Sequence, residues 1–192
     1  MDEVRYGVAL AILMTIPGAL LYWFSIHPLV RFWRRAGVTA TMAIHLLLFA
    51  AVAAIMVMLR RRLLAIDYGT SPLLIALAAP FLVASVALRR TLSRQLKLRA
   101  LMGLNELELT PGAAPLIREG IYARLRHPRY VEIFAALLAG ALFANYLAAY
   151  LVTALAVPGF LAVILLEEAE LLDRYGQEYV RYCAQVPRFW PW

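Results

Sequence analysis

The chain has 192 residues, of which 64% are hydrophobic and 16% are charged, and its formal net charge is +7. Its mean hydropathy of +0.73 is far above that of soluble domains, in which roughly half of the residues are apolar. The composition excludes a soluble globular protein and predicts an all-α, integral membrane helical bundle that forms one domain over residues 1–192.

Five membrane spans are predicted along the chain. Three apolar runs cover residues 6–26, 38–59 and 72–88, and a fourth, uncharged run extends to residue 166. As a single helix the fourth run would be about 54 Å long, which exceeds the hydrocarbon thickness. We therefore predict a turn at Asn145, the only strongly polar residue in this run, between spans at 130–144 and 147–166.

The basic residues predict the orientation of these spans. Five spans place the loops 27–37 and 89–129 and the C-terminal tail at one end, together with most of the 19 Lys and Arg residues. The positive-inside rule puts this end in the cytoplasm, although Arg60 to Arg62 at the other end oppose the bias. Anionic lipid headgroups account for the basic loops, so no nucleic-acid partner is expected.

The first polar island, residues 120–130, reads GIYARLRHPRY. Pro128 suits the first helical position of the fourth span, because its missing N–H has no partner there in any case. His127 would then lie at the mouth of the helix and Tyr130 in its first turn. Each of these residues, taken singly, also fits an interfacial anchor.

The second polar island, residues 167–191, begins with Glu167 and Glu168 directly after the uncharged run. Carboxylates at that depth are costly unless they have a partner or face water. We predict that the helix continues as an amphipathic extension to about Tyr182, with an exposed Glu170–Arg174 pair. Leu171, Tyr175, Tyr179 and Tyr182 would share one face, which either packs on other cytosolic segments or binds a ligand.

The residue types of the two islands indicate the kind of ligand. Carboxylates accept hydrogen bonds from amines and ribose hydroxyls, and aromatic faces attract a cation such as a sulfonium. A serine nucleophile elbow, a phosphate-binding loop and a zinc-protease motif are all missing from the sequence. The single cysteine, Cys183, matches no metal-ligand spacing, so we expect no metal site and interpret Cys183 as a packing residue.

The order of the motifs resembles that of the isoprenylcysteine carboxyl methyltransferase and phospholipid methyltransferase family, whose members are membrane enzymes that use S-adenosylmethionine. The shared pattern covers roughly residues 116–191. It comprises Arg118 to Tyr122, Arg126 to Tyr130, Glu167-Glu168, Tyr175 to Tyr182, and Arg188 to Pro191.

The resemblance implies roles for these residues. The cofactor-binding residues would be Gly120, Ile121, Tyr122, His127, Pro128, Tyr130, Glu167, Glu168 and Tyr179. The catalytic residues would be Arg126, Glu168 and Arg188. Residues 1–88 would form three N-terminal spans, and residues 89–192 the cytosolic loop, the helical hairpin and the C-terminal cofactor segment. The acceptor would be lipophilic, with the carboxylate of an isoprenylcysteine-like molecule as the expected methyl acceptor.

Three alternatives to this acceptor and activity stay open at the level of sequence. A phospholipid amine would need a base such as His127, Glu132 or Glu168, and the Gly-x-Gly of the phospholipid enzymes is not evident, since Gly103 and Gly112 are too far apart. The tail is also similar to that of sterol reductases, which use NADPH. The third alternative is a non-catalytic membrane scaffold.

Overall fold

The computed structural model describes residues 1–95 and 115–189, and the described part is built of helices. The long helices are α1 (Asp2–Ile26), α3 (Val38–Leu63), α4 (Pro72–Gln95), α6 (Pro128–Ala144) and α7 (Leu147–Tyr175). Shorter elements are α2 (Val30–Ala36), the 3₁₀ helix η2 (Gly120–Ala123) and α8 (Gln177–Gln185). The predicted all-α class is therefore confirmed.

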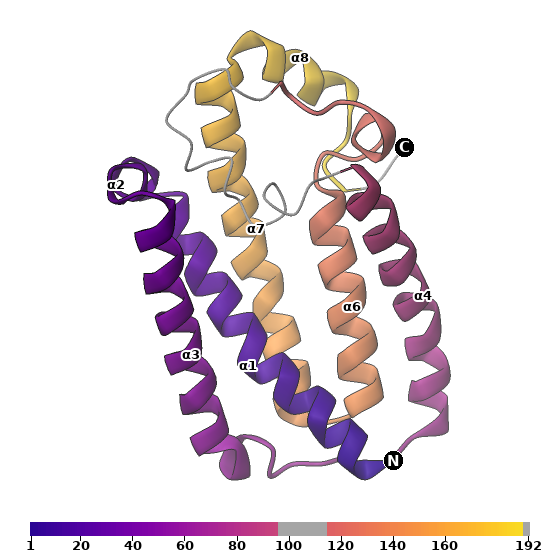
Figure 1. Ribbon diagram of the computed structural model, residues 1–192. Coiled ribbons are helices and arrows are strands. Elements are labelled where there is room, and N and C mark those ends of the chain that lie inside the picture. The colour runs from indigo at the N-terminus through magenta and orange to yellow at the C-terminus, as the bar shows by residue number, and fades with distance from the viewer. Residues whose placement is uncertain (96–114, 190–192) are drawn as a thin grey trace.

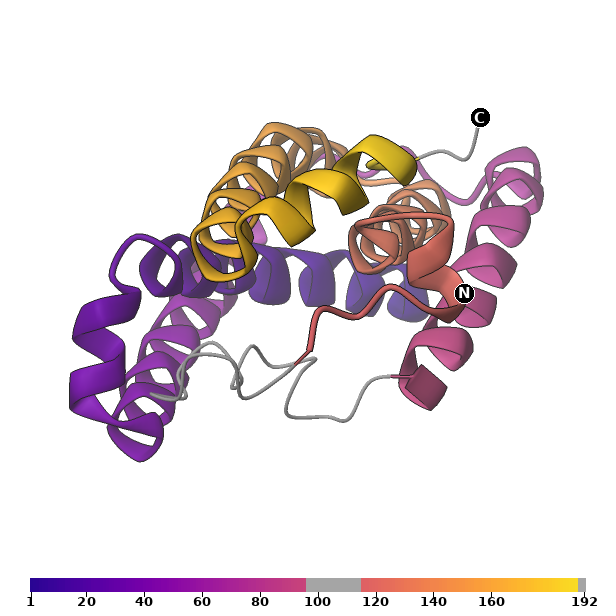
Figure 2. The ribbon, with the colours of Figure 1, turned by 90° about the horizontal axis from the view of Figure 1, so that it is seen from above.

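Four helices, α1, α3, α4 and α7, are long and apolar enough to cross a membrane. The fifth predicted span corresponds to α6, which has 17 residues and is shorter than these four. Figure 1 shows the long helices side by side, with α1 inclined across the bundle, and Figure 2 shows α8 lying across one end of it. The chain is thus a helical membrane protein, and the crossing by α6 stays a prediction.

Close approach at glycines lets α1 pack in the centre of the bundle. A Cβ atom added at Gly140 of α6 would lie 3.1 Å from Ile12, and one at Gly159 of α7 would lie 3.0 Å from Leu20. Without such atoms the backbones of α6 and α7 can approach α1 closely, as small residues commonly allow in membrane helix pairs. Ile12 and Leu13 of α1 are accordingly buried in the main hydrophobic core.

The predicted hairpin turn at Asn145 is confirmed. Asn145 adopts the left-handed conformation, with φ 56° and ψ 44°, and ends α6, a conformation that asparagine tolerates better than most residues. Its side chain donates to the carbonyl of Gly69 (2.9 Å) and accepts from the hydroxyl of Tyr150 (2.9 Å). The turn is therefore tied to the loop between α3 and α4.

A cluster that we call the N-terminal clamp joins three segments at this end of the bundle. Its centre is Arg5, whose side chain is 1% exposed. Arg5 pairs with Asp67, donates to Asp2 at 3.0 Å and to Thr70 at 3.3 Å, and lies over the ring of Tyr146. A buried charge is tolerated only with such partners, so the clamp compensates for the burial of Arg5.

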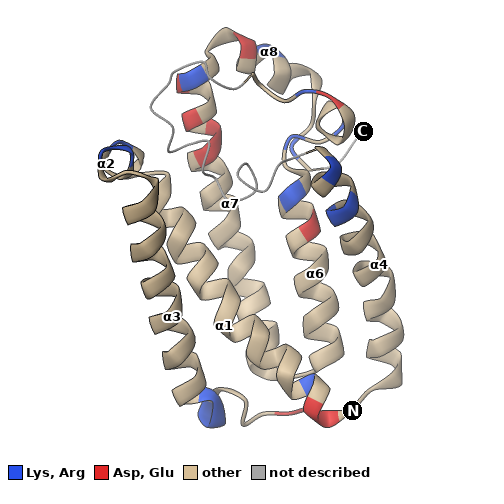
Figure 3. Cartoon of the chain, in the orientation of Figure 1, with Lys and Arg blue, Asp and Glu red and all other residues tan. Residues whose placement is uncertain are grey.

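The remaining charges lie at the ends of the helices, as Figure 3 shows, and leave the middle of the bundle apolar. Arg60 to Arg62 lie at the end of α3 that is near the N-terminal clamp. The segments that carry α2, α8 and the two polar islands lie at the opposite end, which we call the polar end.

The second island differs from its prediction in one respect. The helix does continue beyond Glu168, but it ends at Tyr175, and the predicted unbroken extension to Tyr182 is wrong. Gly176 takes φ 52° and ψ −127°, a conformation that is accessible to glycine because it lacks a Cβ atom. The chain turns there, and α8 starts in a new direction.

The N-terminal clamp predicts that replacing Asp67 with Asn lowers stability, because Arg5 then loses its charged partner in the α3–α4 loop. The loss should be at least about 1 kcal/mol, since hydrogen bonds to charged groups contribute about 1.5 to 3 kcal/mol and Asp2 remains as a partner. In thermal unfolding of the detergent-purified chain, each kcal/mol corresponds to about 2 to 4 °C. The Glu3→Gln variant, which changes an exposed acid of the same helix, is the control and should melt like the wild type.

The pH dependence of this difference is a further readout of the same variant. Burial alone would raise the pKa of Asp67, but hydrogen bonds from the Gly69 backbone N–H and from Arg5 hold it below its ordinary value. A group with a lowered folded-state pKa stabilises the fold above its unfolded pKa, and this contribution is lost as the pH falls through the folded value. The melting temperatures of wild type and Asp67→Asn should therefore converge in acid, and a constant difference would contradict the assignment.

Candidate functional site

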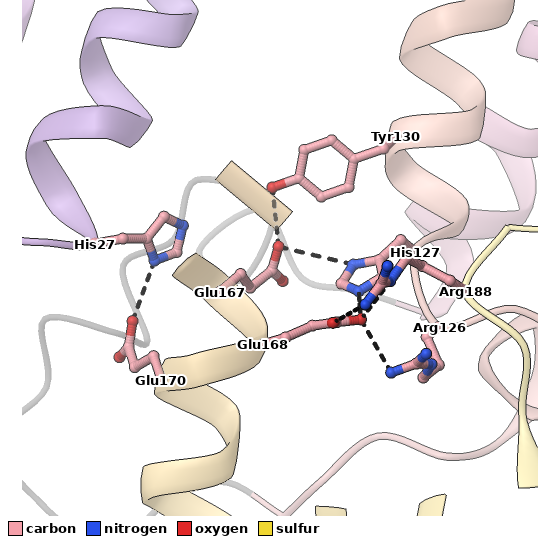
Figure 4. Close-up of polar contacts among 8 residues, drawn as sticks. All are labelled: His27, Arg126, His127, Tyr130, Glu167, Glu168, Glu170 and Arg188. Carbon is pink, nitrogen blue, oxygen red and sulfur yellow. Dashed lines mark hydrogen bonds and ion pairs between the residues drawn. The ribbon is translucent and has the colours of Figure 1, made fainter. Parts of the chain in front are cut away.

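The two polar islands meet at the carboxylate of Glu168, as Figure 4 shows. Its Oε1 atom lies 3.0 Å from His127 Nε2, 3.0 Å from Arg188 Nε and 2.9 Å from Arg126 Nη1. Its Oε2 atom accepts a second hydrogen bond from Arg188, at 2.5 Å. We call these four residues the Glu168 cluster, and they come from the loop before α6, from α7 and from the C-terminal tail.

Local structure explains why these side chains converge. Pro128 opens α6, as predicted, and His127 caps it, so the ring of His127 lies at the mouth of the helix. The tail runs beside this segment, because the backbone N–H groups of Arg126 and His127 donate to the carbonyls of Pro187 (3.0 Å) and Arg188 (3.2 Å). These two backbone hydrogen bonds bring Arg188 to Glu168.

Glu167, the neighbouring carboxylate, has few partners of its own. It accepts one hydrogen bond from the hydroxyl of Tyr130, at 2.9 Å, and lies 3.9 Å from His127 Nδ1. Its side chain is 28% exposed. A carboxylate has about four acceptor positions, so Glu167 can accept further hydrogen bonds from a ligand's hydroxyl or ammonium groups.

Glu168 differs from Glu167 because Arg126, His127 and Arg188 already contact its carboxylate oxygens. Two guanidinium groups share this single carboxylate, so positive charge exceeds negative charge within the cluster, before the neighbouring Glu167 is counted. The hydrogen bonds to Glu168 raise the pKa of Arg188 above its ordinary value, so this residue stays charged. The geometry therefore gives Glu168 the task of holding Arg126, His127 and Arg188 in place, and gives the surplus charge the capacity to hold an anion.

The predicted tyrosine face is used for packing. Tyr179 and Tyr182 are buried with Val186, and the predicted face members Leu171 and Tyr175 pack against them. The hydroxyl of Tyr182 donates to the carbonyl of Tyr122 at 2.7 Å, and burial raises the pKa of Tyr182 to about 12. Of the two interpretations left open for this face, docking onto other segments describes the contacts of Tyr182.

Cys183 lies next to this face and is half-buried among the tyrosines. Its sulfur accepts a hydrogen bond from Arg126 Nη1 at 2.8 Å. The thiol therefore contacts the Glu168 cluster in addition to packing, a contact that the sequence did not indicate.

Gly120 and Ile121 contact α4, which is not one of the elements that form the Glu168 cluster. They begin η2 beside the end of α4, where the N–H of Ile121 donates to the side chain of Gln95 at 3.3 Å. The next residue, Tyr122, accepts a hydrogen bond from Tyr182 at its backbone carbonyl, and burial and the negative charge of Glu167 raise the pKa of its hydroxyl. Gly103 and Gly112, and Pro191 of the closing motif, lie outside the described residues.

A second cluster surrounds Glu170 at the same end of α7. The predicted pair with Arg174 is present at 3.1 Å, but Glu170 also contacts the buried His27 at 3.2 Å and Arg34 at 3.4 Å. Its side chain is only 16% exposed, so the interpretation of Glu170 as part of an exposed pair was wrong. The cluster joins α7 to the end of α1 and to α2.

His27 also stacks on Trp23, with ring centroids 5.4 Å apart. The guanidinium of Arg129 also lies over the Trp23 ring, 5.0 Å from its centroid. Sequence reasoning missed Trp23 and His27, because an aromatic residue and a histidine at the end of an apolar span look like interfacial anchors.

Within residues 1–95 and 115–189, no group of three or more His, Cys, Asp or Glu side chains could hold a metal ion.

Comparison with known proteins gives a family match over more than half of the chain. The family model described as phospholipid methyltransferase matches residues 74–178, which run from the start of α4 to the start of α8 and include His127, Glu167 and Glu168. No match was found among curated proteins or among solved structures.

The Glu168 cluster predicts that Glu168→Gln loosens the tail while the bundle stays folded. Glutamine keeps the size of the side chain but loses its charge, and charge-assisted hydrogen bonds contribute about 1.5 to 3 kcal/mol each. We expect hydrogen exchange at the amides of Arg126 and His127, which donate to the tail, to accelerate at least about tenfold, equivalent to 1.4 kcal/mol.

Asp173→Asn provides the matched control for this measurement, since Asp173 is an exposed acid on the same helix. Its amide exchange pattern should equal that of the wild type. Unchanged protection of Arg126 and His127 in Glu168→Gln would show that the backbone pairing alone holds the tail.

Proposed function

The chain belongs to the phospholipid methyltransferase family, and from this premise we propose that it transfers a methyl group from S-adenosylmethionine to a lipophilic acceptor at the polar end of the bundle. The acceptor group is the carboxylate of an isoprenylcysteine-like molecule. The observation that carries the proposal is the Glu168 cluster, which gathers Arg126, His127 and Arg188 beside the open carboxylate of Glu167.

The residues around Glu167 have the donor and acceptor chemistry that the cofactor requires. Glu167 can accept hydrogen bonds from ribose hydroxyls or from an ammonium group, and Tyr130 fixes the orientation of its carboxylate. The surplus positive charge of Arg126 and Arg188 suits the carboxylate group of the cofactor. When bound, S-adenosylmethionine supplies an electrophilic methyl group on a sulfonium.

The reaction needs positioning more than proton transfer. A carboxylate acceptor is nucleophilic as it stands, so its oxygen would take the methyl group from the bound sulfonium without the help of a base. Arg126 or Arg188 orients the acceptor through paired hydrogen bonds. Glu168 fixes both arginines, which reduces the entropy lost on reaching the reactive geometry.

The amine of a phospholipid is the second candidate acceptor, and the description of the matched family favours it. An amine must lose a proton, which requires a base. Glu132 points to α4, where it accepts from Ser85 at 3.3 Å and from Arg89 at 3.2 Å. His127 is then the base that lies beside Glu167, and parallel assays with a carboxylate and an amine acceptor separate the two candidates.

We predict that the detergent-purified chain binds S-adenosylmethionine and does not bind NADPH comparably. A ligand present at 100 times its Kd stabilises the fold by about 2.7 kcal/mol, so only S-adenosylmethionine should raise the melting temperature. Stabilisation by NADPH alone would favour a sterol-reductase-like enzyme. Stabilisation by neither cofactor would favour a scaffold without catalytic activity.

Substitution of the two carboxylates tests the site itself. Glu167→Gln and Glu168→Gln should each lower cofactor affinity or turnover at least about tenfold, or 1.4 kcal/mol. Asp173→Asn should leave both quantities unchanged, because Asp173 is exposed. Full affinity and turnover in both glutamine variants would exclude this site.

The proposed orientation places the polar end and the C-terminus in the cytosol, since the basic loops lie there. Single cysteines at Arg118, Asp173 and Arg62, in a chain with Cys183 replaced, test this orientation with an impermeant thiol reagent on intact cells. Arg62→Cys should react, whereas Arg118→Cys and Asp173→Cys should react only after permeabilisation. The reverse pattern would invert the topology but keep the helical hairpin.

A further inference from the structure

Arg129 has an unusual environment for an arginine at the polar end. Its guanidinium is stacked 5.0 Å from the ring centroid of Trp23, and Trp23 is itself buried in the bundle, at 7% exposure. An arginine that only anchors the protein in lipid headgroups would extend outward from the helices. Arg129 instead reaches inward from α6 to α1.

Arg129 forms no ion pair with a carboxylate among the described residues, and its recorded contact is with the Trp23 ring. The other inward-facing arginines of this end are paired there: Arg126 and Arg188 with Glu168, and Arg34 and Arg174 with Glu170. Stacking on an indole contributes about 0.5 to 2 kcal/mol but does not neutralise the cation. It also leaves the N–H groups at the edge of the guanidinium plane available for an oxyanion.

The position of Arg129 relates it to the proposed site of methyl transfer. Burial and Glu167 raise the pKa of the Tyr122 hydroxyl, whereas Arg129 lowers it, so Arg129 and Glu167 both act on the same hydroxyl group. Trp23 stacks on His27, which binds Glu170 one turn beyond Glu167. Figure 4 shows Glu167 between the His27–Glu170 pair and the Glu168 cluster.

We propose that Arg129, held on Trp23, recognises the oxyanion of the methyl acceptor, a carboxylate or a phosphate on an amphipathic molecule. This inference rests on the proposed function, and it assigns a specificity-determining residue to the acceptor. An oxyanion beside Glu167 would then meet Arg129 on the α1 side and Arg126 or Arg188 on the side of the Glu168 cluster. A bidentate contact to the edge of Arg129 would fix the headgroup while its chain extends along the helices.

The test measures binding of defined probes to the full-length chain in a non-ionic detergent. A farnesyl thioether that ends in a carboxylate and the neutral methyl ester of the same molecule form one pair of probes. Dioctanoyl phosphatidylethanolamine, which carries a phosphate, is the third probe. The wild type should bind one of the two anionic probes at least about tenfold more tightly than the ester, a difference of 1.4 kcal/mol. The tighter anionic probe identifies the source of the oxyanion.

Two substitutions at Arg129 and one control then assign this preference. Arg129→Gln should lower the affinity for the preferred anionic probe at least about tenfold and leave the affinities for the ester and for S-adenosylmethionine unchanged. Arg129→Lys should give an intermediate loss, because an ammonium offers a point charge in place of a planar fork. Arg124→Gln, which alters an exposed arginine of the same island, should bind every probe like the wild type.

The outcomes separate this inference from the proposed function. Binding of both anionic probes by the wild type no more tightly than the ester, or unchanged anion binding in both Arg129 variants, would overturn the role of Arg129 even if S-adenosylmethionine binds. A parallel loss of S-adenosylmethionine affinity in Arg129→Gln would also overturn it, by moving Arg129 to the cofactor. A wild type that binds no S-adenosylmethionine would contradict the proposed function. Loss of the anion preference in Arg129→Gln would still support the role of Arg129 as an oxyanion-binding residue, because the lipid probes are measured without the cofactor.

Discussion

The arrangement of the polar end depends on one constraint: a carboxylate that directly follows the apolar part of a helix needs positively charged partners. Glu168 lies in α7 directly after turns that are made of hydrocarbon side chains, where an uncompensated charge is costly. Three cationic or polar groups from two other segments meet this need: Arg126, His127 and Arg188. Satisfying one carboxylate thus orders the loop before α6 and the tail beside it. The neighbouring Glu167 keeps part of its acceptor capacity because it does not take part in the same pairing.

A buried charge also has an opposite charge beside it at the other end of the bundle, in the N-terminal clamp. Arg5 is buried, and the loop between α3 and α4 supplies Asp67 as its counterion. Between these two ends the helices carry few charges and pack through apolar side chains and through the glycines that face α1. The fold therefore consists of two polar clusters separated by an apolar layer, with α1 and α7 running from one cluster to the other. Such a division lets the apolar layer tolerate variation in shape while the polar groups fix the register of the helices.

The sequence predicted those parts of this arrangement that depend on local chemistry. The uncharged run was too long for one span and contained one asparagine, so the hairpin and its turn at Asn145 followed. The meeting of the two islands followed from the hairpin. The break at Gly176 was missed because the polar pattern continues past it, and only the backbone conformation reveals the change of direction. Contacts such as His27 with Glu170 could not be predicted, since they join residues far apart in sequence and each partner alone looks like an interfacial residue.

The continuity of α7 has a mechanical consequence. One helix of 29 residues carries Glu167, Glu168 and Glu170 near one end, while its other end follows a turn tied to the α3–α4 loop. Membrane helices respond to a thicker or thinner bilayer by changing their tilt. Because α7 is fastened at the far end, a change in its tilt displaces the three acids together as a rigid set. The depth of the carboxylates is thus coupled to the thickness of the surrounding bilayer.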